Sequence, residues 1–179
     1  MNNEGRSIIY WTLGFLKYIY MKKTLFVALV ATSLFACKSN VETKPAFDLE
    51  NAKKEIAENN AKFEEYVSKT DSTGLASMYT TDAKWMNPNG PSVEGRAALV
   101  SKFGNDLLAG IGGAKLTTTD AWGDENYVTE EGKFEIFAKD GSLLDKGKYL
   151  VLWKNVDGKL LFFRDIFNSD LPIPAPAAK

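Results

Sequence analysis

The chain has 179 residues, of which 45% are hydrophobic and 25% charged, as expected for one globular domain with additional segments. A formal net charge of −1 without a basic stripe argues against nucleic acid as the main partner. The chain has no histidine and one cysteine, which excludes an intrachain disulfide and a Cys/His dyad and leaves no indication of a metal or cofactor.

Residues 21–36 have the pattern of an export signal. Two lysines after Met21 are followed by an apolar run from Thr24 to Phe35 and then by Ala36 and Cys37. This order resembles a bacterial lipobox, which implies that Cys37 is lipidated and becomes the mature N-terminus. The alternative is a buried cysteine behind a short transmembrane helix, although the run is shorter than the roughly 20 residues a span needs.

The other N-terminal segments fit the same interpretation. Residues 1–20 are either a start-site artefact or an extended positively charged region before the signal. Residues 37–46 are polar and without periodicity, which predicts a flexible tether. We therefore expect an extracytoplasmic domain anchored by lipid to a membrane, the outer membrane of a Gram-negative bacterium.

The first half of the domain is predicted to be mainly helical. A loosely helical apolar stripe predicts a helix over residues 47–69, with Asp48 as its N-cap. A second, short helix follows residues 70–72 and extends to about residue 79. Residues 80–82 are predicted as a turn and residues 83–87 as a strand. Gly95 and Arg96 begin a third helix that ends near Leu108.

The second half is predicted to be a sheet of four strands. The first two cover residues 114–122 and 126–137, with a bulge or bend expected at Gly132. The last two form a hairpin over residues 147–168, joined at Asp157-Gly158. Alternation places Tyr149, Val151 and Trp153 on one face of the third strand. In the fourth strand, Phe163, Asp165 and Phe167 share one face, and Arg164, Ile166 and Asn168 share the other. Residues 171–179 are predicted as an extended Pro/Ala tail.

Helices followed by an antiparallel sheet predict an α+β fold. We expect about three N-terminal helices packed on a curved, mainly antiparallel sheet, which together form a cone-shaped α+β barrel. The mouth of such a cone is a typical place for small ligands.

Several segments resemble the nuclear transport factor 2-like superfamily, in particular its SnoaL-like branch. They are residues 75–83, 87–90, 94–96, 131–134, 147–154 and 164–170. The resemblance covers residues 47–170 and implies the cone fold, but it is not specific for a reaction. In the isomerases of this superfamily a carboxylate near the end of the first strand removes a proton. That position matches Asn87, whose amide cannot act as a base.

The candidate ligand pocket contains aromatic and polar side chains. Trp85 and Asn87 share a face of the first strand, and Tyr149, Trp153, Arg164 and Asn168 come from the hairpin. The competing interpretation is that the aromatic residues are core, that Asn87 satisfies a loop, and that Arg164 is exposed.

Glu130 and Asp165 are the candidate catalytic groups if the protein is an enzyme. Glu130 shares a face with apolar residues, where a carboxylate has a raised pKa; its competing interpretation is an exposed position on a twisted edge. Asp165 is the alternative acid, and its competing interpretation is that the resemblance implies only an aspartate that recurs with the fold.

Three functions remain open at this point. The first is binding of a small apolar or amphipathic molecule without turnover. The second is a SnoaL-like lyase, isomerase or hydrolase that uses Glu130 or Asp165 with Tyr149 as a hydrogen-bond donor. The third is a protein-interaction module. The resemblance also implies a homodimer formed through the outer sheet face, for which Phe163 and Phe167 are candidates. A buried carboxylate within hydrogen-bond reach of Tyr149 would favour the enzyme.

Overall fold

The computed structural model describes residues 46–172. The predictions for residues 1–20, for the signal at 21–36, for Cys37 and for most of the tether and tail therefore lie outside the described residues. Among the residues that are described, no helix combines the length and the apolar character needed to cross a membrane.

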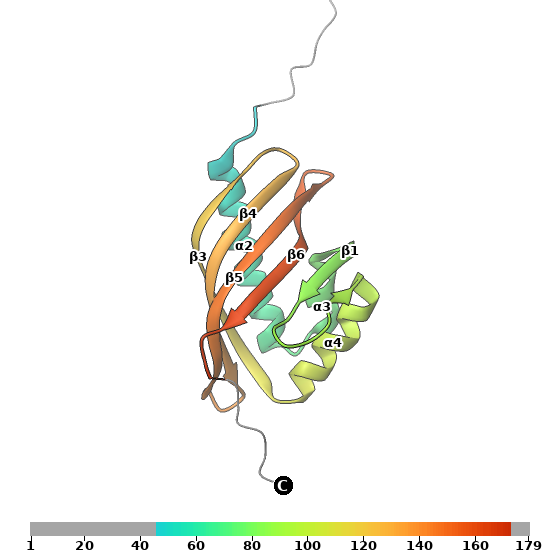
Figure 1. Ribbon diagram of the computed structural model, residues 1–179. Coiled ribbons are helices and arrows are strands. Elements are labelled where there is room, and N and C mark those ends of the chain that lie inside the picture. Colours follow the sequence, from blue (N-terminus) through green and yellow to red (C-terminus); the bar gives the residue numbers. More distant parts are fainter. Residues whose placement is uncertain (1–45, 173–179) are drawn as a thin grey trace, which may run out of the picture. The chain divides into compact units, whose positions relative to one another are not determined.

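The domain consists of helices packed on one six-stranded sheet (Figure 1). Its elements in chain order are α2 (Leu49–Ser68), α3 (Ser72–Ser77), β1 (Tyr79–Met86), β2 (Val93–Glu94), α4 (Arg96–Leu108), β3 (Ile111–Gly123), β4 (Tyr127–Ala138), β5 (Leu143–Val156) and β6 (Lys159–Ser169). The strand order is β2-β1-β6-β5-β4-β3, and only the β1–β6 pair is parallel. The predicted α+β fold, with three helices on a curved, mainly antiparallel sheet, is confirmed.

Helix α2 lies along the sheet and supplies one wall of the core (Figure 1). It begins where expected, because the Asp48 side chain accepts hydrogen bonds from the backbone N–H groups of Glu50 and Asn51. Its buried positions are Ala52, Ile56, Asn60 and Val67, which share one helical face. An asparagine therefore stands in the middle of an otherwise apolar stripe.

The β5–β6 hairpin forms as predicted at Asp157-Gly158. These two residues have φ values of 53° and 82°, the left-handed conformation that a tight hairpin turn of this kind requires. Tyr149, Val151 and Trp153 are all buried on the inner face of β5, as the alternation predicted.

The alternation predicted for β6 is wrong at one position. Leu152 pairs with Arg164, whereas Trp153 pairs with Phe162, so Phe163 is an extra residue in the ladder. This bulge turns Phe162 and Asp165 to the inside and separates Phe163 from their face.

Two further predictions differ from the structure. Residues 80–82 are not a turn, because β1 already begins at Tyr79. The irregularity expected at Gly132 lies in the neighbouring strand, where Thr119 is the extra residue of β3. Gly132 itself is needed for another reason: a Cβ atom at this position would collide with the ring of Tyr149.

Candidate functional site

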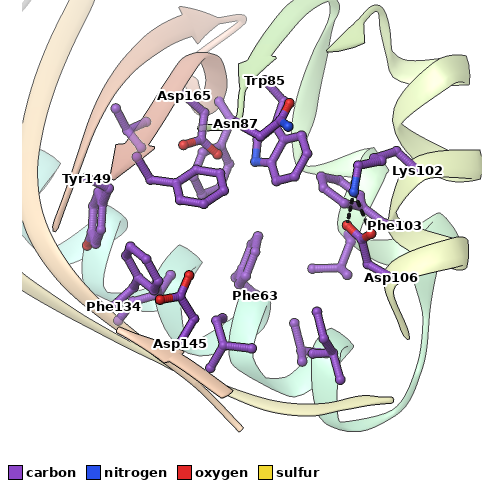
Figure 2. A pocket seen from close by; sticks show the side chains of 18 of the residues that line it. Phe63, Trp85, Asn87, Lys102, Phe103, Asp106, Phe134, Asp145, Tyr149 and Asp165 are labelled. Carbon is purple, nitrogen blue, oxygen red and sulfur yellow. Dashed lines mark hydrogen bonds and ion pairs between the residues drawn. The ribbon is translucent and has the colours of Figure 1, made fainter. Parts of the chain in front are cut away.

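A cavity of about 410 Å³ lies against the inner face of the sheet, and α2 and α4 contribute to its walls (Figure 2). Most of its lining is apolar and aromatic. The aromatic residues of the lining are Phe63, Trp85, Phe103, Phe134, Tyr149, Phe162 and Phe167. The polar groups in the lining belong to Asn60, Asn87, Lys102, Asp106, Asp145, Tyr149 and Asp165.

Aromatic contacts hold one wall of the cavity together. The ring of Trp85 lies 5.7 Å from Phe103, edge to face, and 5.3 Å from Phe167. Phe167 in turn contacts Phe134 at 5.5 Å between ring centroids. Such arrangements stabilise aromatic pairs beyond simple burial. The wall therefore joins β1, α4, β6 and β4 into one continuous apolar surface.

A lysine from α4 adds a charge beside this wall. The Nζ atom of Lys102 lies 4.9 Å from the ring centroid of Trp85 and forms an ion pair with Asp106 one turn later. Both charged side chains are about 30% exposed, at 31% and 29%. They are therefore reached by solvent, whereas Phe103 and Phe134 of the aromatic wall are buried.

Asp165 is the carboxylate that the cavity buries most deeply. Its side chain accepts a hydrogen bond of 2.6 Å from the hydroxyl of Tyr79, and the residue is 8% exposed. The pKa of Asp165 is raised to about 6, mainly by burial; the hydrogen bond from Tyr79 offsets part of this rise, and the charge of Glu130 adds a smaller increase. Burial, followed by the charge of Asp165, also raises the pKa of Tyr79 well above its ordinary value.

Glu130 is fully buried behind the cavity wall and accepts hydrogen bonds from four side chains. Its Oε1 atom accepts from Asn60 Nδ2 at 2.7 Å, from the Thr118 hydroxyl at 2.6 Å and from the Tyr149 hydroxyl at 2.7 Å. Its Oε2 atom accepts from Trp153 Nε1 at 2.9 Å. Glu130 is not among the residues that line the cavity. Burial, and then the charge of Glu130, raise the pKa of Tyr149 above its ordinary value.

The predicted pocket residues divide into two groups. Trp85, Asn87, Tyr149 and Asp165 line the cavity (Figure 2). Trp85 lies on β1 and Asn87 directly after it, Tyr149 lies on β5, and Asp165 lies on β6. Trp153 is buried behind the cavity and donates to Glu130.

Two other predicted pocket residues lie away from the cavity. The guanidinium of Arg164 stacks 3.6 Å from the ring centroid of Phe163 and donates to the backbone oxygen of Asp82. Asn168 is exposed. Conversely Phe167, expected on the outer face, lines the cavity.

Asn60 and Lys102 are two polar residues of the cavity lining that the sequence predictions missed. Asn60 interrupts the apolar stripe of α2, which is the signal that would have identified it. Lys102 has no such signal, because a lysine on a helix is ordinarily exposed. No group of three or more acidic, cysteine or histidine side chains is arranged for metal binding within residues 46–172.

Comparison with known proteins identifies the fold. No family model matches the chain, and no curated protein does. Among solved structures, a Mycobacterium tuberculosis protein of unknown function matches with a TM-score of 0.61 and 18% identity, over 70% of this chain and 75% of that one. A nuclear transport factor 2-like superfamily protein from Salmonella enterica matches with a TM-score of 0.58 and 12% identity, over 74% and 100% of the two chains.

A ketosteroid isomerase-like protein from Erwinia carotovora also matches, with a TM-score of 0.54 and 16% identity, over 64% of this chain and 94% of that one. At these identities the likeness concerns the fold and not the chemistry. The chain therefore has the nuclear transport factor 2-like fold.

Proposed function

We propose that this protein binds a small, mainly apolar molecule that carries a polar group, without converting it. The observation that supports this most directly is the cavity itself. Its volume of about 410 Å³ lies within the range of small-molecule sites, and a few polar groups stand among its aromatic walls. The size and the mixed lining suit an amphipathic ligand better than a macromolecule.

Binding without turnover is supported by the roles of the polar side chains. By the sequence resemblance, the position of the isomerase base falls on Asn87, which has an amide in place of a carboxylate. Tyr149 does donate a hydrogen bond to a buried carboxylate, which by itself favours the enzyme. That carboxylate, on Glu130, is surrounded by four donors and lies outside the cavity lining. Its arrangement suits a structural role.

A second candidate function is acid/base catalysis by Asp165, of the SnoaL-like kind. Asp165 lines the cavity, and its pKa is raised to about 6. A general acid or base works best when its pKa is near the pH at which the enzyme operates, which is commonly near neutral. Catalysis would replace binding as the preferred function if the wild-type protein converted the molecule isolated from the cavity and the Asp165→Asn variant did not.

The proposed function is tested by native mass spectrometry of the protein as purified from its own host. We expect a discrete additional mass in the wild-type protein that is lost on denaturation, because a mainly apolar cavity of this size favours an apolar ligand over water. The mass should disappear in Trp85→Ala, which removes a wall of the cavity. Trp122→Ala is the matched control, since Trp122 is 45% exposed and does not line the cavity. An unliganded wild-type protein would contradict a tightly held ligand.

We also propose that Cys37 is lipidated and holds the domain at a membrane outside the cytoplasm. The support is the order of charge, apolar run, small residue and cysteine in the sequence. Fractionation of cells provides the test. Wild-type protein should be found in the membrane fraction, and its intact mass should include the lipid. The Cys37→Ala variant should lose the lipid mass. An unmodified cysteine in the wild type would refute the anchor.

A further inference from the structure

Asn60 carries a buried acceptor atom that the protein leaves without a partner. The residue is 5% exposed and belongs to the cavity lining. Within residues 46–172, its Oδ1 atom has no hydrogen-bond partner. Buried polar atoms in folded proteins are nearly always bonded, so an exception calls for an explanation.

The orientation of this amide is fixed by its surroundings. Its nitrogen lies 2.7 Å from Oε1 of Glu130, an atom that also receives the hydroxyls of Thr118 and Tyr149. Only the N–H side of the amide can face such an acceptor. The carbonyl oxygen is therefore turned away from Glu130, and rotating the amide by 180° would bring two acceptors together.

The hydroxyl groups near the cavity are already committed to carboxylates. Tyr149 donates to Glu130 and Tyr79 donates to Asp165. Each phenol has a single hydrogen to donate, so neither is free to bond a carbonyl oxygen on a ligand.

A second amide oxygen, Oδ1 of Asn87, is also buried and has no partner in the described chain. Two donor groups of the lining also have partners, since Lys102 Nζ pairs with Asp106 and Asn87 Nδ2 lies 3.5 Å from the backbone oxygen of Pro88. The side-chain atoms of the lining that are buried without a partner in the described chain are therefore the two amide oxygens, both acceptors.

We propose that the molecule held in this cavity carries a hydroxyl or N–H group that donates a hydrogen bond to Oδ1 of Asn60. The proposal rests on the proposed function and specifies the class of ligand. Glu130 acts as a positioning residue, since it holds the Asn60 amide with its carbonyl available. A donor on the ligand would satisfy an acceptor that otherwise remains buried and unpaired, whereas a ketone or ether would leave it so.

Three probes that share a naphthalene ring test the proposal on the full chain: 2-naphthol has a hydrogen-bond donor, and 2-methoxynaphthalene and 2-acetylnaphthalene have none. Isothermal titration calorimetry should give wild-type affinity about tenfold higher for 2-naphthol than for the other two, as expected for one buried hydrogen bond. Equal affinities for the three probes would overturn the proposal and leave the proposed function standing. Failure of all three to bind would contradict both.

Two variants locate the donor's partner. Asn60→Leu removes the acceptor and should bring the tenfold preference close to one. Thr118→Val removes a different hydrogen bond to the same oxygen of Glu130 and keeps Asn60, so the preference should persist. A preference that survives in Asn60→Leu would refute the assignment to Asn60.

A measurement on the wild-type protein keeps the test decisive if Asn60→Leu does not fold. The side-chain amide signals of Asn60 in a nitrogen–proton NMR spectrum should shift more with 2-naphthol than with 2-methoxynaphthalene at equal saturation. Equal shifts with both probes would count against the hydrogen bond.

Discussion

Asp165 lines the cavity and accepts a hydrogen bond from the buried Tyr79 hydroxyl. Because its pKa is raised, the stability of the fold depends on whether it is protonated. Its pKa is about 6 in the folded protein, against 3.8 for an unperturbed group. The folded state therefore binds this proton more tightly than the unfolded state does. Its stabilising contribution is complete below about pH 4 and is lost as the pH rises through 6.

The first prediction concerns this pH dependence. The two pKa values differ by an amount that corresponds to about 3 kcal/mol of unfolding free energy. Asp165→Asn resembles the protonated acid and keeps an acceptor for the Tyr79 hydroxyl. We expect this variant to be more stable than the wild type at pH 7.5 and close to it at pH 4.5, measured by urea unfolding. A wild-type advantage at pH 7.5 would mean that the carboxylate is stabilised by its site.

The second prediction concerns Glu130. Glutamine has the same shape, but its NH₂ group would face one of the four donors that now bond to the carboxylate. We expect Glu130→Gln to lower the unfolding free energy by about 2–3 kcal/mol, since one buried donor then faces an NH₂ group and has no acceptor. The exposed neighbour gives the control, because Glu131→Gln should change stability by less than about 0.5 kcal/mol. Equal effects at the two positions would contradict the buried network.

At the scale of elements, the pairing of β4 with β5 depends on a glycine. Gly132 pairs with Tyr149, whose ring lies over the position where a Cβ atom would be. The ring can therefore extend across β4 and bring its hydroxyl to Glu130. A side chain at position 132 would displace both the ring and the cavity wall that it forms.

The third prediction follows from this contact. Gly132→Ala should cost about 1–3 kcal/mol of unfolding free energy, as overpacking usually does. In a Tyr149→Ala background the same change should cost much less, because the ring is gone. Urea unfolding of the four proteins of this cycle measures the difference. Additive effects would show that the glycine is required for backbone reasons and not for the ring.

The sequence predicted the elements better than it predicted their faces. Apolar periodicity and turn residues are local signals, so the helices, the Asp157-Gly158 turn and the buried face of β5 followed from them. The bulge at Phe163 was not predictable, because no glycine or proline marks it and strict alternation assumes a regular ladder. This single extra residue accounts for the wrong grouping of Phe163 with Asp165.

The site was predicted in part for a related reason. Trp85, Asn87, Tyr149 and Asp165 lie on strands or strand ends, whose inward positions can be read from alternation. Lys102 lines the cavity because α4 packs beside β1. This packing is a tertiary contact, which cannot be predicted from the local sequence pattern around Lys102. Asn60 did leave a signal, a polar residue within an apolar helical stripe.

At the scale of the whole molecule, the outer face of the sheet carries exposed apolar side chains. Leu150 and Ile166 pair with one another across β5 and β6 and are 42% and 43% exposed. Phe167, expected there, faces the cavity instead, so the outer patch is built from aliphatic residues and Phe163. Neighbouring apolar residues on a surface are typical of an interface.

The fourth prediction is that this face joins two copies of the chain. Sedimentation equilibrium should give the mass of a dimer for the wild type and of a monomer for Leu150→Glu combined with Ile166→Glu, because paired charges there would be buried in the interface. Leu108→Glu is the control, since Leu108 is 78% exposed on α4. A monomeric wild type would refute the dimer.

The central claim is that the small molecule binds inside the cavity and not on the outer sheet. The indole N–H signals of selectively labelled protein test it, because Trp85 lines the cavity, Trp153 lies behind it, and Trp122 is exposed on β3. On addition of 2-naphthol we predict a large shift of the Trp85 signal, a smaller one for Trp153, and none for Trp122. A shift of Trp122 with Trp85 unchanged would contradict the account.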